Sequence, residues 1–110
     1  MILFPALATA QSDILEKNCR FVYDMSKGAM AARQTKDDMP HQMEVIAKLA
    51  AESAVPDEKE TLRSIARTVV VRAYDKPMEN SLEAKQRTTA AFANSEYGRC
   101  MQGRIFSERR

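Results

Sequence analysis

The sequence predicts an all-α domain, built as a four-helix up-down bundle with one disulfide that joins the first helix to the fourth. Three observations predict this fold. Glycine is scarce, with 3 residues among 110, and no alternating strand pattern occurs. Start and stop signals divide the chain into four segments whose apolar residues recur at helical spacing. The only two cysteines, Cys19 and Cys100, lie near opposite ends of the chain.

The first helix is expected from about residue 13 to residue 33, with Ser12 or Asp13 as its N-cap. Its apolar residues form one broad face that includes Cys19 and Val22. Gly28 lies inside this segment, where a glycine costs about 1 kcal/mol relative to alanine. We therefore expect another helix to approach closely at Gly28.

A polar connector over residues 34–38 separates the first helix from the second. Asp38 is the expected N-cap, and Pro40 is suited to the first turn because no intrahelical N–H bond is required there. The helix is expected to end near Ser53, because the residue before Pro56 resists the helical conformation.

The third helix is expected over about residues 58–74, because Asp57 and Glu60 form a capping box. Three consecutive valines near its end point around well over half of the helix circumference. One interpretation is a central helix that two neighbours bury. The other is a partner-binding or dimer face built around Val71 and Tyr74.

The fourth helix is expected from about residue 82 to residue 102, with Asn80 or Ser81 as its N-cap. Gly103 is the expected helix stop. The inner side of this helix carries Phe92 and Cys100. Seven arginines of the third helix and the C-terminal region do not alternate with aromatic residues, and we expect them to form a solvated face: Arg63, Arg67, Arg72, Arg99, Arg104, Arg109 and Arg110.

The two cysteines predict a structural disulfide. In an up-down-up-down bundle the start of the first helix and the end of the fourth lie at the same end of the molecule. The topology thus brings Cys19 and Cys100 together, although 81 positions separate them. Closing so long a loop would stabilise the fold by roughly 4 kcal/mol. The alternative is two unrelated buried thiols in a cytosolic protein.

The first ten residues carry no charged side chain and end in Ala8-Thr9-Ala10, the small-x-small pattern that a signal peptidase recognises. We interpret residues 1–10 as the remnant of an export signal, residues 11–103 as the helical domain and residues 104–110 as a basic tail. The alternative is an apolar tail that packs on the fold or frays. Export predicts a periplasmic or secreted protein, where disulfides persist.

Composition excludes several functional classes. The chain has 17 basic and 15 acidic residues and a formal charge of +2, too weak to indicate nucleic acid as a partner. No apolar run approaches the roughly 20 residues of a membrane-spanning helix. The sequence has no glycine-rich phosphate loop and no metalloprotease motif. We therefore expect no catalytic residue, no bound cofactor and no transmembrane segment.

His41 is the only histidine, and Met39 and Met43 lie on either side of it. Two thioethers and an imidazole are soft ligands that can hold Cu(I). Against this, Met39 and Met43 share a helix face from which His41 points away. A solvent-facing histidine beside two core methionines is the simpler interpretation.

Several short segments resemble uncharacterised small exported helical proteins of proteobacteria. The segments are Cys19 at the start of an apolar helix, the Ala-Met-Ala-Ala-Arg run that ends at Arg33, the Ala-Tyr-Asp-Lys-Pro run over residues 73–77, and Phe92 with Tyr97 before Cys100. The resemblance implies a helical periplasmic fold with a disulfide between its two ends, and it brings no catalytic residue. In size, helicity and single disulfide, the chain is also similar to periplasmic acid-stress chaperones, although its cysteine spacing is much longer.

Together these observations predict a non-enzymatic periplasmic or secreted protein that acts through protein–protein interaction. An inhibitor, an immunity protein and a chaperone all fit this description. The partner would be another protein or a second copy of the chain. The alternative is a carrier of copper or of a small ligand, with Met39, His41 and Met43 as the candidate metal ligands.

Overall fold

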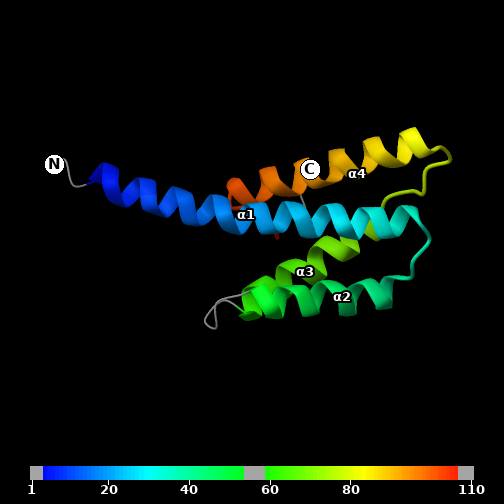
Figure 1. The fold of residues 1–110 in the computed structure, drawn as a ribbon, viewed down its shortest axis with the longest axis horizontal. Coiled ribbons are helices and arrows are strands. Elements are labelled where there is room, and N and C mark those ends of the chain that lie inside the picture. The colour runs from blue at the N-terminus through cyan, green and yellow to red at the C-terminus, as the bar shows by residue number, and fades with distance from the viewer. Residues whose placement is uncertain (1–3, 54–58, 107–110) are drawn as a thin grey trace.

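Four helices that run alternately up and down make up the part of the chain that the structure describes (Figure 1): α1 Phe4–Gln34, α2 Met39–Ser53, α3 Lys59–Tyr74 and α4 Leu82–Met101. The structure is a computed structural model that describes the backbone of residues 4–53 and 59–106, and the side chains of residues 15–52 and 60–106. No strand occurs within those residues. The predicted all-α class with four helices is therefore confirmed.

Helix α1 is the element against which the other three pack. Figure 1 shows α4 along one side of α1 and the α2–α3 pair along the other. Helix α3 packs against both α1 and α2, whereas the backbones of α3 and α4 do not pack closely together. The molecule is therefore an array centred on α1 in which α4 packs closely on α1 alone.

The start of α1 differs from the prediction. The helix begins at Phe4 instead of near Asp13, so neither Ser12 nor Asp13 is its N-cap. Residues 4–12 include three alanines and a leucine, which are good helix formers, and Pro5 falls in the first turn, where proline is tolerated. The segment over residues 4–10, which we interpret as part of an export-signal remnant, thus belongs to α1.

Gly28 was expected to mark the close approach of another helix, and this expectation is wrong. Gly28 is exposed, and a Cβ atom built there would have no neighbouring atom within 4 Å. The next residue, Ala29, is fully buried. Gly28 therefore lies on the outer face of α1, one helical step away from the core.

The predicted N-caps of α2 and α4 are confirmed. The Asp38 carboxylate accepts a hydrogen bond from the His41 N–H at 2.8 Å, and the Ser81 hydroxyl accepts one from the Ala84 N–H at 3.1 Å. Each side chain satisfies one of the free N–H groups in the first helical turn. Asp57, the expected N-cap of the third helix, lies outside the described residues.

Two helices end on residues in the left-handed region. Gly103 follows α4 with φ 69°, and the Arg104 N–H donates to the Arg99 carbonyl at 2.7 Å, which completes a Schellman motif. Gly103 is thus the helix stop that the sequence predicts. Lys36 has the same role after α1 with φ 67°, although it lacks the conformational freedom of glycine.

The hydrophobic core draws residues from all four helices. Val69 and Val70 of α3 are fully buried, whereas Val71 is 50% exposed, so the third valine points away from the core. Ile105 also belongs to the core cluster. The predicted basic tail over residues 104–110 therefore begins with a segment that folds back onto the helices, and the structure describes it as far as Phe106.

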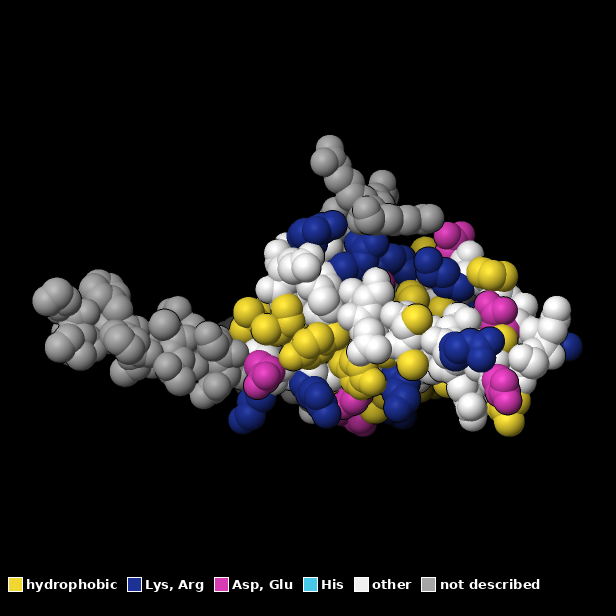
Figure 2. All heavy atoms as spheres, turned by 90° about the horizontal axis from the view of Figure 1, so that it is seen from above, with side chains coloured by type: hydrophobic (Ala, Val, Ile, Leu, Met, Phe, Trp, Pro, Cys, Tyr) yellow, Lys and Arg dark blue, Asp and Glu magenta, His cyan; other side chains and the backbone are white. Residues whose placement is uncertain are grey.

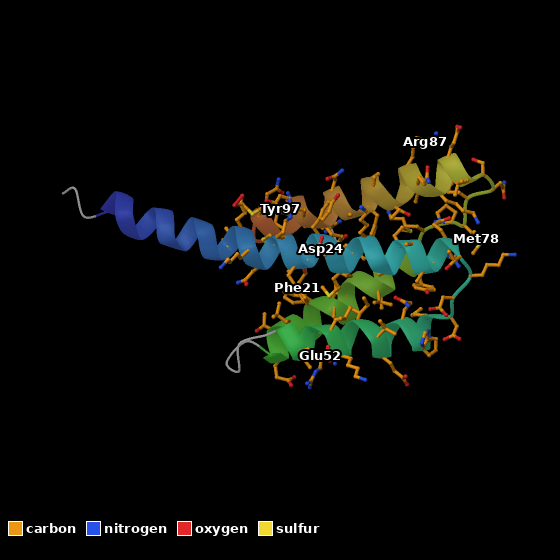
Figure 3. The ribbon with its side chains drawn as sticks, in the orientation of Figure 1. Phe21, Asp24, Glu52, Met78, Arg87 and Tyr97 are labelled. Atoms are coloured by element: carbon orange, nitrogen blue, oxygen red, sulfur yellow. A yellow bond between two sulfur atoms is a disulfide. The ribbon has the colours of Figure 1, made fainter. Side chains whose placement is uncertain are left out.

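The predicted disulfide between Cys19 and Cys100 is confirmed, with 5.5 Å between the two Cα atoms. It joins α1 to the last turn of α4, and Cys19 is fully buried. Next to it, the rings of Tyr23 and Tyr97 meet edge to face with their centroids 6.2 Å apart, and Figure 3 labels Tyr97 on α4. The seam between α1 and α4 is thus closed by a covalent bond and an aromatic contact.

Replacing both cysteines with alanine should lower the free energy of unfolding by about 4 to 5 kcal/mol, because the disulfide closes a loop of 81 residues in the unfolded chain. Urea unfolding of the oxidised protein and of the double variant measures this difference. Equal midpoints for the two proteins would contradict it.

Candidate functional site

A cleft of about 650 Å³ lies between α4 and the end of α3, and we call it the α3–α4 cleft. Its walls are one side of α4, Arg72 of α3 and the link from Asp75 to Glu79 that joins the two helices. Met30 of α1 also lines it. The cleft exists because α3 and α4 each pack on α1 and leave a space between them.

A buried carboxylate spans this space. The side chain of Glu96 on α4 is 2% exposed, and both of its oxygens accept hydrogen bonds from the Arg72 guanidinium, at 2.6 and 3.0 Å. Arg99 lies 3.8 Å from the same carboxylate. Arg72 also donates to the Ile105 carbonyl at 2.5 Å, so this network joins α3, α4 and the C-terminal segment.

This network corrects the sequence interpretation of the arginines. The side chains of Arg72 and Arg99 are 20% and 13% exposed, so they do not belong to a solvated face. A signal for the network was present in the sequence. Glu96 lies four residues after Phe92 and four before Cys100, on the side of α4 that was expected to face inward. An inward-facing carboxylate requires a basic partner.

The end of α1 holds the link that forms one wall of the cleft. Gln34 is buried, donates to the Pro77 carbonyl at 3.1 Å and accepts from the Glu79 N–H at 2.8 Å. Arg33 donates to the Lys76 carbonyl at 3.0 Å. These bonds fix the link from both sides of Pro77, so the cleft has a rigid wall.

The cleft combines apolar lining with charged groups. Ala91, Phe92 and Pro77 provide apolar surface. Among the described residues, the charged groups that line it toward the C-terminal end of α4 include Arg72, Glu96, Arg99 and Arg104. Figure 2 shows Lys and Arg side chains gathered in the upper middle of the face that α4 presents.

The structure places the two residues of the predicted partner face in different surroundings. Val71 is half exposed, with Arg67 one turn before it and Asp75 one turn after it. Tyr74 instead packs against the core, and its hydroxyl donates to the Asp37 carbonyl at 2.7 Å. Burial, followed by the negative charge of Asp37, raises the pKa of Tyr74. Neither residue lines the α3–α4 cleft.

The candidate copper ligands are also separated. Met39 and Met43 are half-buried and pack against the hydrophobic core, whereas His41 is exposed. His41 Nδ1 lies 2.9 Å from an Asp37 carboxylate oxygen, so the imidazole faces Asp37 instead of the thioethers. Within the described residues, no group of three or more His, Cys, Asp or Glu side chains could hold a metal ion.

Asp37 and His41 form an exposed pair at the start of α2. The hydrogen bond and the charge of Asp37 raise the pKa of His41 above its ordinary value of 6.5. The hydrogen bonds from His41 and then from Gln42, whose amide lies 2.9 Å away, lower the pKa of Asp37 below 3.8. Because Tyr74 binds the Asp37 carbonyl, the pair lies where α1, α2 and α3 meet.

No protein-family model, no curated protein and no solved structure matches this chain. None of the helices that the structure describes has both the length and the apolar character needed to cross a membrane.

Replacing Glu96 with glutamine should lower the free energy of unfolding by about 3 kcal/mol, because the change leaves two mostly buried guanidinium groups without their shared carboxylate. Glu52→Gln, on the exposed face of α2 (Figure 3), is the matched control and should change stability by less than about 0.5 kcal/mol. Urea unfolding compares the two variants with the parent protein. Similar midpoints for both variants would show that the network does not stabilise the fold.

Stability should depend on pH through Asp37 and His41. The stabilisation from the raised pKa of His41 is complete below pH 6.5 and is lost as the pH rises through that raised pKa. The stabilisation from the lowered pKa of Asp37 is present above pH 3.8 and is lost as the pH falls through that lowered pKa. The pair should therefore stabilise the fold most between pH 3.8 and pH 6.5.

Thermal unfolding from pH 5 to pH 9 tests the upper limit of this window. The melting temperature of the parent protein should fall as the pH rises above about 6.5, whereas that of His41→Gln should change less. Parallel curves for the two proteins would exclude a contribution from His41.

Proposed function

We propose that the protein is a non-enzymatic periplasmic or secreted binding protein, and that the α3–α4 cleft receives a segment of another protein. The cleft itself is the observation that carries this proposal. Its volume of about 650 Å³ lies within the range of ligand sites, and it joins an apolar lining to a few charged groups held in place.

The disulfide supports the proposed compartment. Cys19 and Cys100 form a bond that joins α1 to the last turn of α4. Disulfides of this structural kind persist in oxidising compartments and are rare in the cytosol. Small exported domains also use such bonds to compensate for a limited hydrophobic core.

The chemistry of the described residues supports binding over catalysis. Both oxygens of Glu96 are held by Arg72, so this carboxylate acts as a fixed acceptor in the wall of the cleft. His41 could act as an acid or a base near neutral pH, but it lies on α2 and does not line the cleft. The groups that line the cleft are therefore suited to recognition.

The rigidity of the cleft supports a specific partner. Gln34 fixes the link from Pro77 to Glu79, and the disulfide fixes the far end of α4. A preformed groove binds its segment with little loss of conformational entropy. An inhibitor or immunity protein fits this arrangement better than a chaperone that must adapt to many clients.

A photo-reactive residue in the cleft tests the proposal. Benzoylphenylalanine at Ala91, which is exposed and lines the cleft, should yield one discrete cross-linked species in the cells that produce the protein. Ala90 is the matched control, because it is exposed on the same helix but does not line the cleft. The same reporter at Ala90 should not yield that species.

Mass spectrometry of the Ala91 adduct would then identify the bound segment. Equal patterns from both positions, or no adduct from either position in a protein with native helicity, would contradict the proposed binding function.

A further inference from the structure

We propose that the disulfide between Cys19 and Cys100 gates the α3–α4 cleft. When the bond is closed, it holds the last turn of α4 to α1 and the cleft is formed. When the bond is reduced, the C-terminal half of α4 leaves α1, while α1, α2 and α3 remain folded together. This inference rests on the proposed function and adds its regulation, because the partner segment would bind only the oxidised protein.

Helix α4 contributes few apolar side chains to the core. Of its 20 residues, Phe92 is a buried member of the core cluster, and the half-buried Cys100 packs against that cluster. The shorter helices α2 and α3 contribute more residues to the cluster or against it: Met39, Met43, Ile46 and Ala50 of α2, and Leu62, Ile65, Ala66, Val69, Val70, Ala73 and Tyr74 of α3. Because burial of apolar surface is the main favourable term in packing, α4 depends most on its covalent bond.

The ion pair between α3 and α4 opposes this release only weakly. Glu96 is buried, and Arg72 donates to both of its oxygens. When α4 leaves, both charged groups regain water, and their hydration largely offsets the lost attraction. The variant Glu96→Gln is different, because it keeps the guanidinium groups buried without their carboxylate. The ion pair therefore positions α4 but does not replace the disulfide.

The disulfide holds the end of α4 that lies farthest from the link to α3. At the start of α4, Lys85 donates to the Gln34 carbonyl at 2.9 Å, and this contact does not depend on the disulfide. At the other end, Cys100 ties the last turn to α1. Release should therefore begin in the C-terminal half of α4, which includes Ser95 and Gly98 in the wall of the cleft.

Thiol–disulfide exchange with a dithiol opens the bond. Cys19 is fully buried, whereas Cys100 is partly exposed, so a thiolate of the dithiol attacks Cys100 Sγ. The bond between the two Sγ atoms breaks, and Cys19 leaves as a thiolate that takes up a proton. The second thiolate of the dithiol then attacks the dithiol sulfur of the mixed disulfide and releases the Cys100 thiolate, which takes up the second proton. The dithiol loses two electrons and becomes a disulfide, and the reverse exchange with a disulfide oxidant closes the cleft.

Hydrogen exchange followed by mass spectrometry tests the release of α4. The full-length protein is compared before and after reduction with dithiothreitol. Amides of residues 92–101 should exchange about a hundredfold faster in the reduced protein, because the covalent bond no longer limits their opening. Amides of α2 and α3 should change by less than about tenfold. Cys19→Ala with Cys100→Ala is the control, which should match the reduced protein and should not respond to dithiothreitol.

Two outcomes of this experiment would overturn the inference. Equal exchange of α4 in the oxidised and reduced proteins would show that the bond does not control its attachment. Equal acceleration in all four helices would show that the bond supports the whole fold and does not act on α4 alone.

The reporter at Ala91 separates this inference from the proposed function. With equal amounts of protein in the cells, the cross-linked species should form with the parent cysteines and should be absent when both are replaced with alanine. An adduct that persists without the disulfide would reject gating alone. Absence of the adduct from both proteins would reject the proposed function, and the exchange experiment would still decide whether reduction releases α4.

Discussion

The fold depends on one constraint, which is that α1 is the packing partner of all three other helices. Helix α4 occupies one side of α1, and the α2–α3 pair occupies the other (Figure 1). Because α3 and α4 both pack on α1, they diverge from each other, and the α3–α4 cleft follows from this arrangement. The disulfide and the Gln34 bonds hold the two ends of the cleft to α1. The site is thus a product of the packing order together with the link from Asp75 to Glu79.

Burying the charged groups of the cleft costs free energy, and the packing of the helices does not explain why these groups are there. Burying a carboxylate between two guanidinium groups carries a desolvation penalty, and well-packed apolar residues often stabilise a fold as well or better. Apolar residues in place of Glu96, Arg72 and Arg99 together would remove this penalty. The proposed binding function gives one reason for Arg72, Glu96 and Arg99 at this position, since fixed charges provide specificity for a partner.

The sequence predicted the helices and the disulfide because both depend on local signals and on topology. Asp38 and Ser81 cap helices through neighbours three residues away, and the up-down order alone brings Cys19 to Cys100. The cleft was not predicted, because it depends on the angle between α3 and α4. The partners of the Arg72–Glu96 pair lie 24 residues apart, and no local pattern specifies that pairing. The spacing of Glu96 from Phe92 and Cys100 was enough to predict that Glu96 faces inward. No spacing predicted that Arg72 is its partner.

The position of the disulfide matters both for the stability of the fold and for the proposed function. A domain of this size has a free energy of unfolding of about 5 to 15 kcal/mol. The desolvation of charged groups in the cleft is a substantial fraction of that free energy. The bond between Cys19 and Cys100 acts mainly on the unfolded chain and requires no contact in the cleft. It can therefore offset the desolvation of the charged network without filling the space that a partner would enter. The covalent bond at the α1–α4 seam thus supplies stability that the open, charged space between α3 and α4 does not.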